Sequence, residues 1–101
     1  MHFKDITVET LKNKIKDSEI MIIDIRDQDS YRKDSIPNSI NYKSIDIIKL
    51  AEKRNKQLNI IIYCYRGNSS RKVASFLSDS GFNNIFNLIG GFNAWRDSVS
   101  K

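Results

Sequence analysis

Residues 60–71 read IIIYCYRGNSSR, and this stretch decides both the fold and the place of the chemistry. The β-branched run Ile60–Ile62 is typical of a buried strand, and the residues after Gly67 follow a helical pattern. A short turn between a buried strand and a helix directs backbone N–H groups and the positive end of the helix dipole toward one point. Cys64, the only cysteine, lies in that turn. Such surroundings favour a thiolate.

On either side of this stretch, strand-like and helix-like segments alternate. Strands are predicted at residues 20–25, 39–42, 58–63 and 85–89, with a short one at Ile6. Helices are predicted with these N-caps or first residues: Thr7, Ser44, Ser69 or Ser70, and Phe92. The apolar positions expected to face inward include Ile48, Phe76 and Ile89. The pattern predicts an α/β fold, a single domain over residues 1–101 with a central parallel β-sheet flanked by helices on both faces. Ligands of such sheets bind beyond the carboxyl ends of the strands, which is where Cys64 falls.

Composition excludes several classes of protein. A chain of 101 residues buries roughly two thirds of its unfolded surface, so stability requires neither disulfide nor metal. No apolar run approaches the ~20 residues of a membrane span, and no basic segment leads into an apolar core near the N-terminus, so we expect a cytoplasmic protein without a membrane partner. The net charge is +5, but the lysines are scattered and do not interleave with aromatic residues, so no nucleic-acid partner is expected. No Cys/His cluster has the spacing of zinc ligands, and no metal or cofactor is expected.

A lone cysteine after an apolar strand is often only a small buried hydrophobe. The residues after Cys64 favour chemistry instead. Gly67 permits a positive φ, so that successive N–H groups can turn toward one centre and form an anion-binding nest. Arg66 and Arg71 form an electropositive rim that would lower the pKa of the thiol and attract a small anion, whereas Lys72 is expected to point to water.

Three motifs in order resemble a known family. Residues 64–70, CYRGNSS, resemble the active-site loop of rhodanese-type sulfurtransferases, in particular the GlpE-type single-domain thiosulfate sulfurtransferases. Residues 23–26, IDIR, followed by Tyr31 and Ile36-Pro37, resemble the family's Asp-x-Arg segment. Residues 88–95, LIGGFNAW, resemble its closing Gly-Gly-x-x-x-Trp element. The resemblance therefore extends over essentially the whole domain.

The resemblance implies a thiosulfate:cyanide sulfurtransferase that works through a persulfide on Cys64. The thiolate would attack the outer sulfur of an anionic donor such as thiosulfate, and a second nucleophile would then remove that sulfur. The substrate-binding residues would be those of the loop: Tyr65, Arg66, Gly67, Asn68, Ser69 and Ser70. The N–H groups of residues 65–69 would hold the persulfide charge, and Arg66 would orient the sulfonate. Asp24, Arg26 and Arg71 are candidates for support, with Asp24 and Arg26 either forming a structural pair or bracing the loop.

Because the chain has one cysteine, the persulfide must pass to an external acceptor, such as cyanide in an assay or a cellular thiol or dithiol, for example a thioredoxin-like partner. We expect a monomer or weak dimer. The chain departs from the family pattern around Ile36-Pro37, where Asp34-Ser35 and Asn38-Ser39 replace the Gly-His and Gly-Ala of many members. Asn can replace Gly at a positive φ, but Ser in place of His removes a ring donor, so this departure would affect packing or partner contacts before chemistry.

Three alternatives remain open. A cysteine-dependent phosphatase or arsenate reductase resembles a pattern of cysteine, five residues and arginine, but here that position is Ser70 and the arginine follows at Arg71. A non-catalytic interaction module of this family generally lacks the cysteine. A persulfide carrier fed by another sulfur donor protein needs the same Cys64 loop, so the sequence does not separate it from the enzyme.

Overall fold

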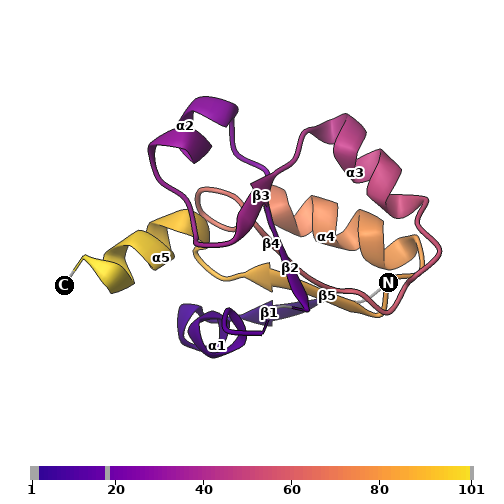
Figure 1. The fold of residues 1–101 in the computed structure, drawn as a ribbon, viewed down its shortest axis with the longest axis horizontal. Helices are drawn as coiled ribbons and strands as arrows, with labels where there is room; N and C mark the ends of the chain where they lie inside the picture. Colours follow the sequence, from indigo (N-terminus) through magenta and orange to yellow (C-terminus); the bar gives the residue numbers. More distant parts are fainter. Residues whose placement is uncertain (1–2, 18, 101) are drawn as a thin grey trace.

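The computed structural model describes residues 3–17 and 19–100, so the ends of the domain predicted over residues 1–101 lie outside the described ranges. The strands are β1 (Lys4–Ile6), β2 (Ile20–Asp24), β3 (Ser39–Asn41), β4 (Asn59–Tyr63) and β5 (Asn84–Leu88). The helices are α1 (Val8–Lys14), α2 (Gln28–Lys33), α3 (Ser44–Ala51), α4 (Ser69–Asp79) and α5 (Gly91–Val99). The strands form one parallel sheet in the order β1-β5-β4-β2-β3 (Figure 1). The predicted fold class is confirmed.

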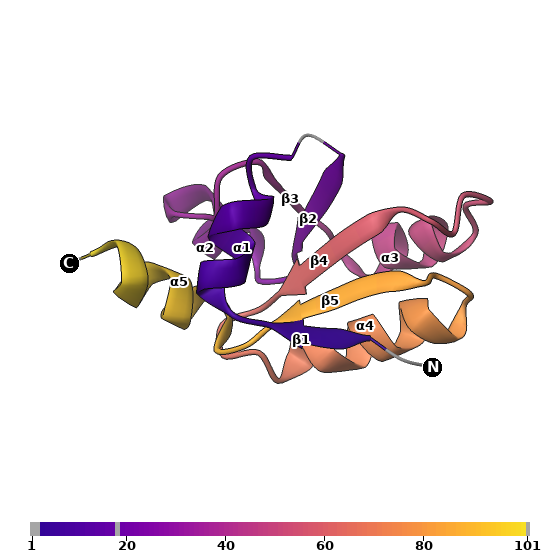
Figure 2. The ribbon, with the colours of Figure 1, turned by 90° about the horizontal axis from the view of Figure 1, so that it is seen from below.

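Strand β4 lies in the middle of the sheet, and its side chains divide between two cores. Ile61 and Tyr63 belong to the core that includes Leu11 of α1 and Phe92 of α5. Ile60 and Ile62 belong to a second core with α3 and α4, whose members include Leu50, Ala74 and Leu77. Alternate residues of a strand point to opposite faces, so the unbroken apolar run of β4 is what a sheet covered on both sides requires. Figures 1 and 2 show α1 and α4 on opposite sides of the sheet.

The helix starts combine predicted and unpredicted caps. Thr7 caps α1, as predicted, by accepting a hydrogen bond from the Thr10 N–H at 3.2 Å. Asp27 caps α2, a helix that the periodicity did not indicate because none of its residues is buried. Two predicted caps are wrong by one or two positions, since the N-cap of α3 is Lys43 and that of α4 is Asn68. None of the helices within the described ranges is long and apolar enough to cross a membrane.

Three residues predicted to face inward lie at the surface instead. Ile48, Phe76 and Ile89 are 50%, 45% and 50% exposed. Ile48 and Phe76 are next in sequence to Ile47 and Leu77, which their helices bury. Ile89 directly follows the last residue of β5. Apolar residues at the edge of a stripe are not distinguished by periodicity from residues at its centre.

Candidate active site

The turn between β4 and α4 encloses the Cys64 sulfur in hydrogen-bond donors. The N–H groups of Gly67 and Ser70 donate to Sγ at 3.1 Å and 3.4 Å, and the Ser70 hydroxyl lies 3.3 Å from it. Gly67 has a φ of +91°, the conformation predicted for this position, which turns its N–H back toward the sulfur. The cysteine is 6% exposed. The loop therefore forms a cradle of hydrogen-bonding groups around this sulfur.

These donors change the acidity of the thiol. Burial alone would raise the pKa of Cys64, but hydrogen bonds from the Ser70 hydroxyl and from the N–H groups of Ser70, Gly67 and Arg66 outweigh it and lower the pKa below its usual value. The prediction named the N–H groups of residues 65–69. The structure adds the N–H of Ser70, in the first turn of α4, to the groups that donate to the sulfur. A helix N-terminus adds its positive dipole end to these bonds.

The closing Gly-Gly motif holds the other side of the same turn. The N–H of Phe92 donates to the carbonyl of Cys64 at 2.7 Å, and the N–H of Asn93 donates to that of Tyr65 at 3.0 Å. The first turn of α5 therefore satisfies its free N–H groups with the backbone of the loop. A Cβ at Gly91 would come within 2.4 Å of the Cys64 carbonyl oxygen, so only glycine permits this approach.

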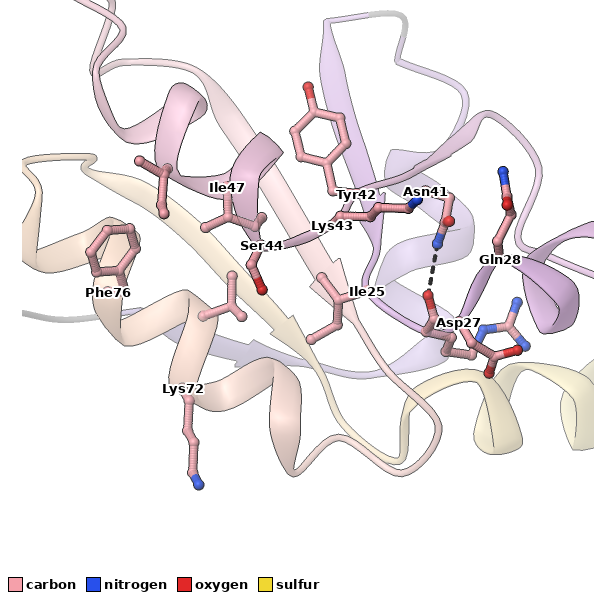
Figure 3. A pocket seen from close by; sticks show the side chains of 13 residues that line it. Ile25, Asp27, Gln28, Asn41, Tyr42, Lys43, Ser44, Ile47, Lys72 and Phe76 are labelled. Carbon is pink, nitrogen blue, oxygen red and sulfur yellow. Dashed lines mark hydrogen bonds between the residues drawn. The ribbon is translucent and has the colours of Figure 1, made fainter.

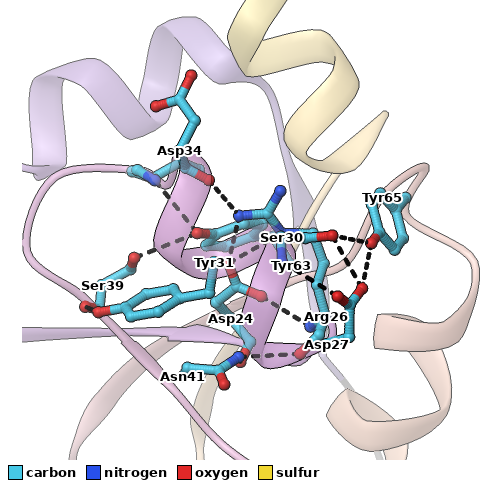
Figure 4. Close-up of polar contacts among 11 residues, drawn as sticks. Asp24, Arg26, Asp27, Ser30, Tyr31, Asp34, Ser39, Asn41, Tyr63 and Tyr65 are labelled. Carbon is cyan, nitrogen blue, oxygen red and sulfur yellow. Dashed lines mark hydrogen bonds and ion pairs between the residues drawn. The ribbon is translucent and has the colours of Figure 1, made fainter.

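The loop after the neighbouring strand β2 is built from charged side chains. Asp24 is fully buried and accepts hydrogen bonds from Nε and Nη2 of Arg26 at 2.9 Å and 2.7 Å. Nη2 also donates to the Asp34 carbonyl at 2.6 Å. The guanidinium carbon lies 4.0 Å from the centre of the Phe92 ring. Of the two roles predicted for Asp24 and Arg26, the structural pair is present (Figure 4). The contact of its guanidinium with the Phe92 ring joins the β2 loop to α5.

A latch formed by Tyr65, Asp27 and Ser30 joins the two loops. The Tyr65 hydroxyl donates to the carboxylate of Asp27 and shares a hydrogen bond with Ser30, both at the start of α2 (Figure 4). The bonds from Tyr65 and Ser30 lower the pKa of Asp27 to about 2. The unpredicted helix α2 therefore supplies the capping residue that anchors the side chain next to Cys64.

The two predicted rim cations have different surroundings. Arg71 donates to Asp5 of β1 at 2.6 Å, and its guanidinium carbon lies 4.9 Å from the centre of the Phe3 ring. Arg66 has an exposed side chain and forms no ion pair with any residue that the structure describes. Asn68 and Ser69 are also exposed, on the outer side of the turn. Arg66 is thus the loop cation that remains available to an incoming anion.

A hollow of about 720 Å³ lies beside the loop, and its apolar walls come from Ile25, which follows β2, and from α3 and α4. Figure 3 shows Ile25, Ile47 and Phe76 around it, with the Lys72 side chain directed away. Asp27 of the latch borders this hollow, whereas Cys64 is not one of its lining residues. The hollow therefore lies beside the Cys64 turn and does not enclose the sulfur.

The structure also brings in residues that sequence reasoning missed. Asn87 is 1% exposed, accepts a hydrogen bond from the Ser70 hydroxyl at 2.5 Å, and lies 3.5 Å from the Gly67 carbonyl. A single polar residue within the apolar segment 85–89 was the available signal, because a buried amide requires partners. At the departure from the family pattern, Asn38 takes a φ of +68°, as expected for Asn in place of Gly.

These features agree with the comparisons with known proteins. A model of the family described as "Rhodanese-like domain" matches residues 7–98. The chain belongs to the rhodanese-like domain family.

Among curated proteins, the chain is similar to "Thiosulfate sulfurtransferase GlpE" of Coxiella burnetii strain RSA 331, with 36% identity over 95% of this chain and 90% of that protein. The protein of the same name from Pseudoalteromonas translucida is 34% identical over 100% of this chain and 96% of its own length. Among solved structures, a rhodanese-like domain protein from Staphylococcus aureus matches with a TM-score of 0.78 and 32% identity, covering 91% of this chain and 90% of that one.

Proposed function

We propose that this protein is a thiosulfate sulfurtransferase that carries the transferred sulfur as a persulfide on Cys64. One observation carries the proposal, the cradle in which Sγ of Cys64 receives N–H bonds from Gly67 and Ser70. These donors stabilise a negative charge on sulfur, as an oxyanion hole stabilises one on oxygen. The names of the relatives above support the choice of thiosulfate as donor.

The first step loads the sulfur. The Cys64 thiolate attacks the outer sulfur of thiosulfate, a new S–S bond forms, and the old S–S bond breaks with its electron pair on the departing sulfite. In the second step a nucleophile such as cyanide attacks the outer sulfur of the persulfide. Thiocyanate leaves and the Cys64 thiolate is restored. Since the chain has one cysteine, the acceptor is a separate molecule, which in a cell is a thiol or dithiol.

Arg66 positions the donor. Its exposed cation extends from the same turn as the cradle, where it can face the sulfonate of thiosulfate while the outer sulfur approaches Sγ. In Arg66→Gln we expect the KM for thiosulfate to rise about threefold to fivefold, the range of an exposed ion pair. Lys72→Gln is the matched control, because this lysine is also exposed but lies in α4, outside the turn, and points away from the hollow in Figure 3. The KM of this variant for thiosulfate should not change. Equal KM values in the two variants would contradict the role of Arg66.

The phosphatase alternative loses support at Arg71. An oxyanion clamp needs a guanidinium facing the cysteine sulfur, whereas Arg71 is ion-paired with Asp5 on the edge strand. The persulfide carrier remains the second candidate, because it uses the same cradle.

The test is a steady-state assay with purified protein, thiosulfate and cyanide that measures both thiocyanate and sulfite. We expect turnover with equal amounts of the two products, and none in Cys64→Ser. Sulfur transfer from a persulfidated donor protein, without turnover on thiosulfate, would identify a carrier instead. Hydrolysis of an aryl phosphate that is lost in Cys64→Ser would identify a phosphatase.

A further inference from the structure

The Ser70 hydroxyl has two neighbours that compete for its single proton. It lies 3.3 Å from Sγ of Cys64 and donates to Oδ1 of Asn87 at 2.5 Å. A hydroxyl can donate to only one of them at a time, although its lone pairs can accept from the other. The direction of this bond therefore depends on the protonation state of the cysteine.

The orientation of the Asn87 amide is set from its other side. Nδ2 donates to the Asp5 carboxylate at 3.1 Å and lies 3.5 Å from the Gly67 carbonyl. A carboxylate and a carbonyl can only accept, so the NH₂ group must face them and Oδ1 must face Ser70. Asp5 is in turn held by Arg71 at 2.6 Å. Within the sheet, Asn87 is in register with Asp5 of β1, which keeps the two side chains on one face.

We propose that the Ser70 hydroxyl is a reversible donor to the Cys64 sulfur and that Asn87 is the positioning residue that sets its direction. In the thiol form, Sγ–H donates to Ser70, and Ser70 donates to Asn87. When the thiol releases its proton to solvent, the hydroxyl turns and donates to the sulfur, leaving Oδ1 of Asn87 without this donor. The cradle can thus match both a neutral and a negative sulfur.

This arrangement makes a counterintuitive prediction about Asn87. Because its carbonyl competes with the thiolate for the hydroxyl proton, removing the amide should favour the thiolate. A residue that merely supports the loop would have the opposite effect, since loosening the N–H groups of Gly67 and Ser70 disfavours a negative sulfur.

The charged groups on the elements packed around the cradle are the same in wild type and variant. They are Arg66 in the loop, the Arg71–Asp5 pair of α4 and β1, the Asp24–Arg26 pair after β2, and Asp27 at α2. Asn87→Leu alters none of these charges, so a shift in the ionisation of Cys64 would report on the hydroxyl.

The experiment measures the pH dependence of Cys64 alkylation by iodoacetamide in wild type, Asn87→Leu, Ser70→Ala and the double variant. Asn87→Leu should increase the acid dissociation constant of Cys64 about threefold to tenfold, the effect of one hydrogen bond. In the Ser70→Ala background the same substitution should have no effect. The proposal would be overturned if the acid dissociation constant of Cys64 decreased or did not change in Asn87→Leu. It would also be overturned if Asn87→Leu increased this constant equally in the Ser70→Ala background.

A second measurement keeps the test decisive if Asn87→Leu does not fold. In wild-type protein, the NMR signals of the Asn87 side-chain amide should titrate together with Cys64 and should lose this titration in Cys64→Ser. Signals that stay constant through the ionisation of Cys64 would contradict the proposal. The proposal rests on the proposed function, in which Cys64 is the reacting thiol. Both measurements, however, follow the ionisation of Cys64 and not sulfur transfer. Failure of the proposed sulfurtransferase reaction would therefore be seen separately.

Discussion

Two loops at the carboxyl edge of the sheet differ in how they are made. The loop after β4 holds the Cys64 sulfur mainly with backbone N–H groups. The backbone N–H groups of α5 donate hydrogen bonds to the carbonyls of this loop. The loop after β2 is built from charged side chains, with the Asp24–Arg26 pair buried at its centre. The first arrangement depends on chain conformation, and the second depends on residue identity. Under the proposed function, the β4 loop would carry the reacting sulfur and the β2 loop would hold that loop in place.

The buried charge pair of the β2 loop should have the largest effect on stability. Arg26→Gln leaves Asp24 buried without its partner, so we expect a loss of about 3–5 kcal/mol in the free energy of unfolding. Arg71→Gln breaks an exposed ion pair between the same residue types and should destabilise the protein far less, because water screens an exposed pair. Urea denaturation of both variants checks this difference. Similar losses would mean that the buried pair has no special role.

The backbone contact of the β4 loop should come next. Gly91→Ala places a methyl group against the Cys64 carbonyl, and overpacking of this kind costs about 1–3 kcal/mol. Gly81→Ala is the matched control, because Gly81 also has a positive φ but its Cβ would meet only the Lys56 side chain at 3.8 Å. Thermal unfolding should show the larger loss for Gly91→Ala, and only that variant should load sulfur more slowly. Equal stability losses in the two variants, with normal sulfur loading in Gly91→Ala, would show that the close contact between α5 and the β4 loop has no special role.

The latch between the two loops should have the smallest effect. Tyr65→Phe removes the exposed hydrogen bonds to Asp27 and Ser30, so the expected loss in the free energy of unfolding is smaller than that of Gly91→Ala. The same substitution should raise the pKa of Asp27 from about 2 toward its ordinary value, which NMR titration measures. Because the folded-state pKa of Asp27 is lowered, the latch contributes stability above the unfolded pKa and loses it as pH falls toward 2. An unchanged Asp27 pKa in Tyr65→Phe would show that the latch is not formed.

The sequence predicted the sheet and the position of Cys64 because both depend on local patterns. The apolar run 58–63 and the turn at Gly67 carry their own signals, and the central strand and the positive φ are confirmed. Helix α2 escaped prediction because it buries no residue and so has no apolar stripe. The contacts of Asn87 with Ser70 and Gly67 join segments 17 and 20 residues apart, and no local pattern encodes such pairs.

Mass spectrometry can show directly whether the β4 loop carries sulfur on Cys64. Wild type, Cys64→Ser and Tyr65→Phe are incubated with thiosulfate, separated from it and analysed intact and after digestion. We predict one added sulfur atom on Cys64 in wild type and in Tyr65→Phe, removed by a thiol, and none in Cys64→Ser. Folded wild-type protein that gains no sulfur, or gains it at a site other than Cys64, would contradict a persulfide on Cys64.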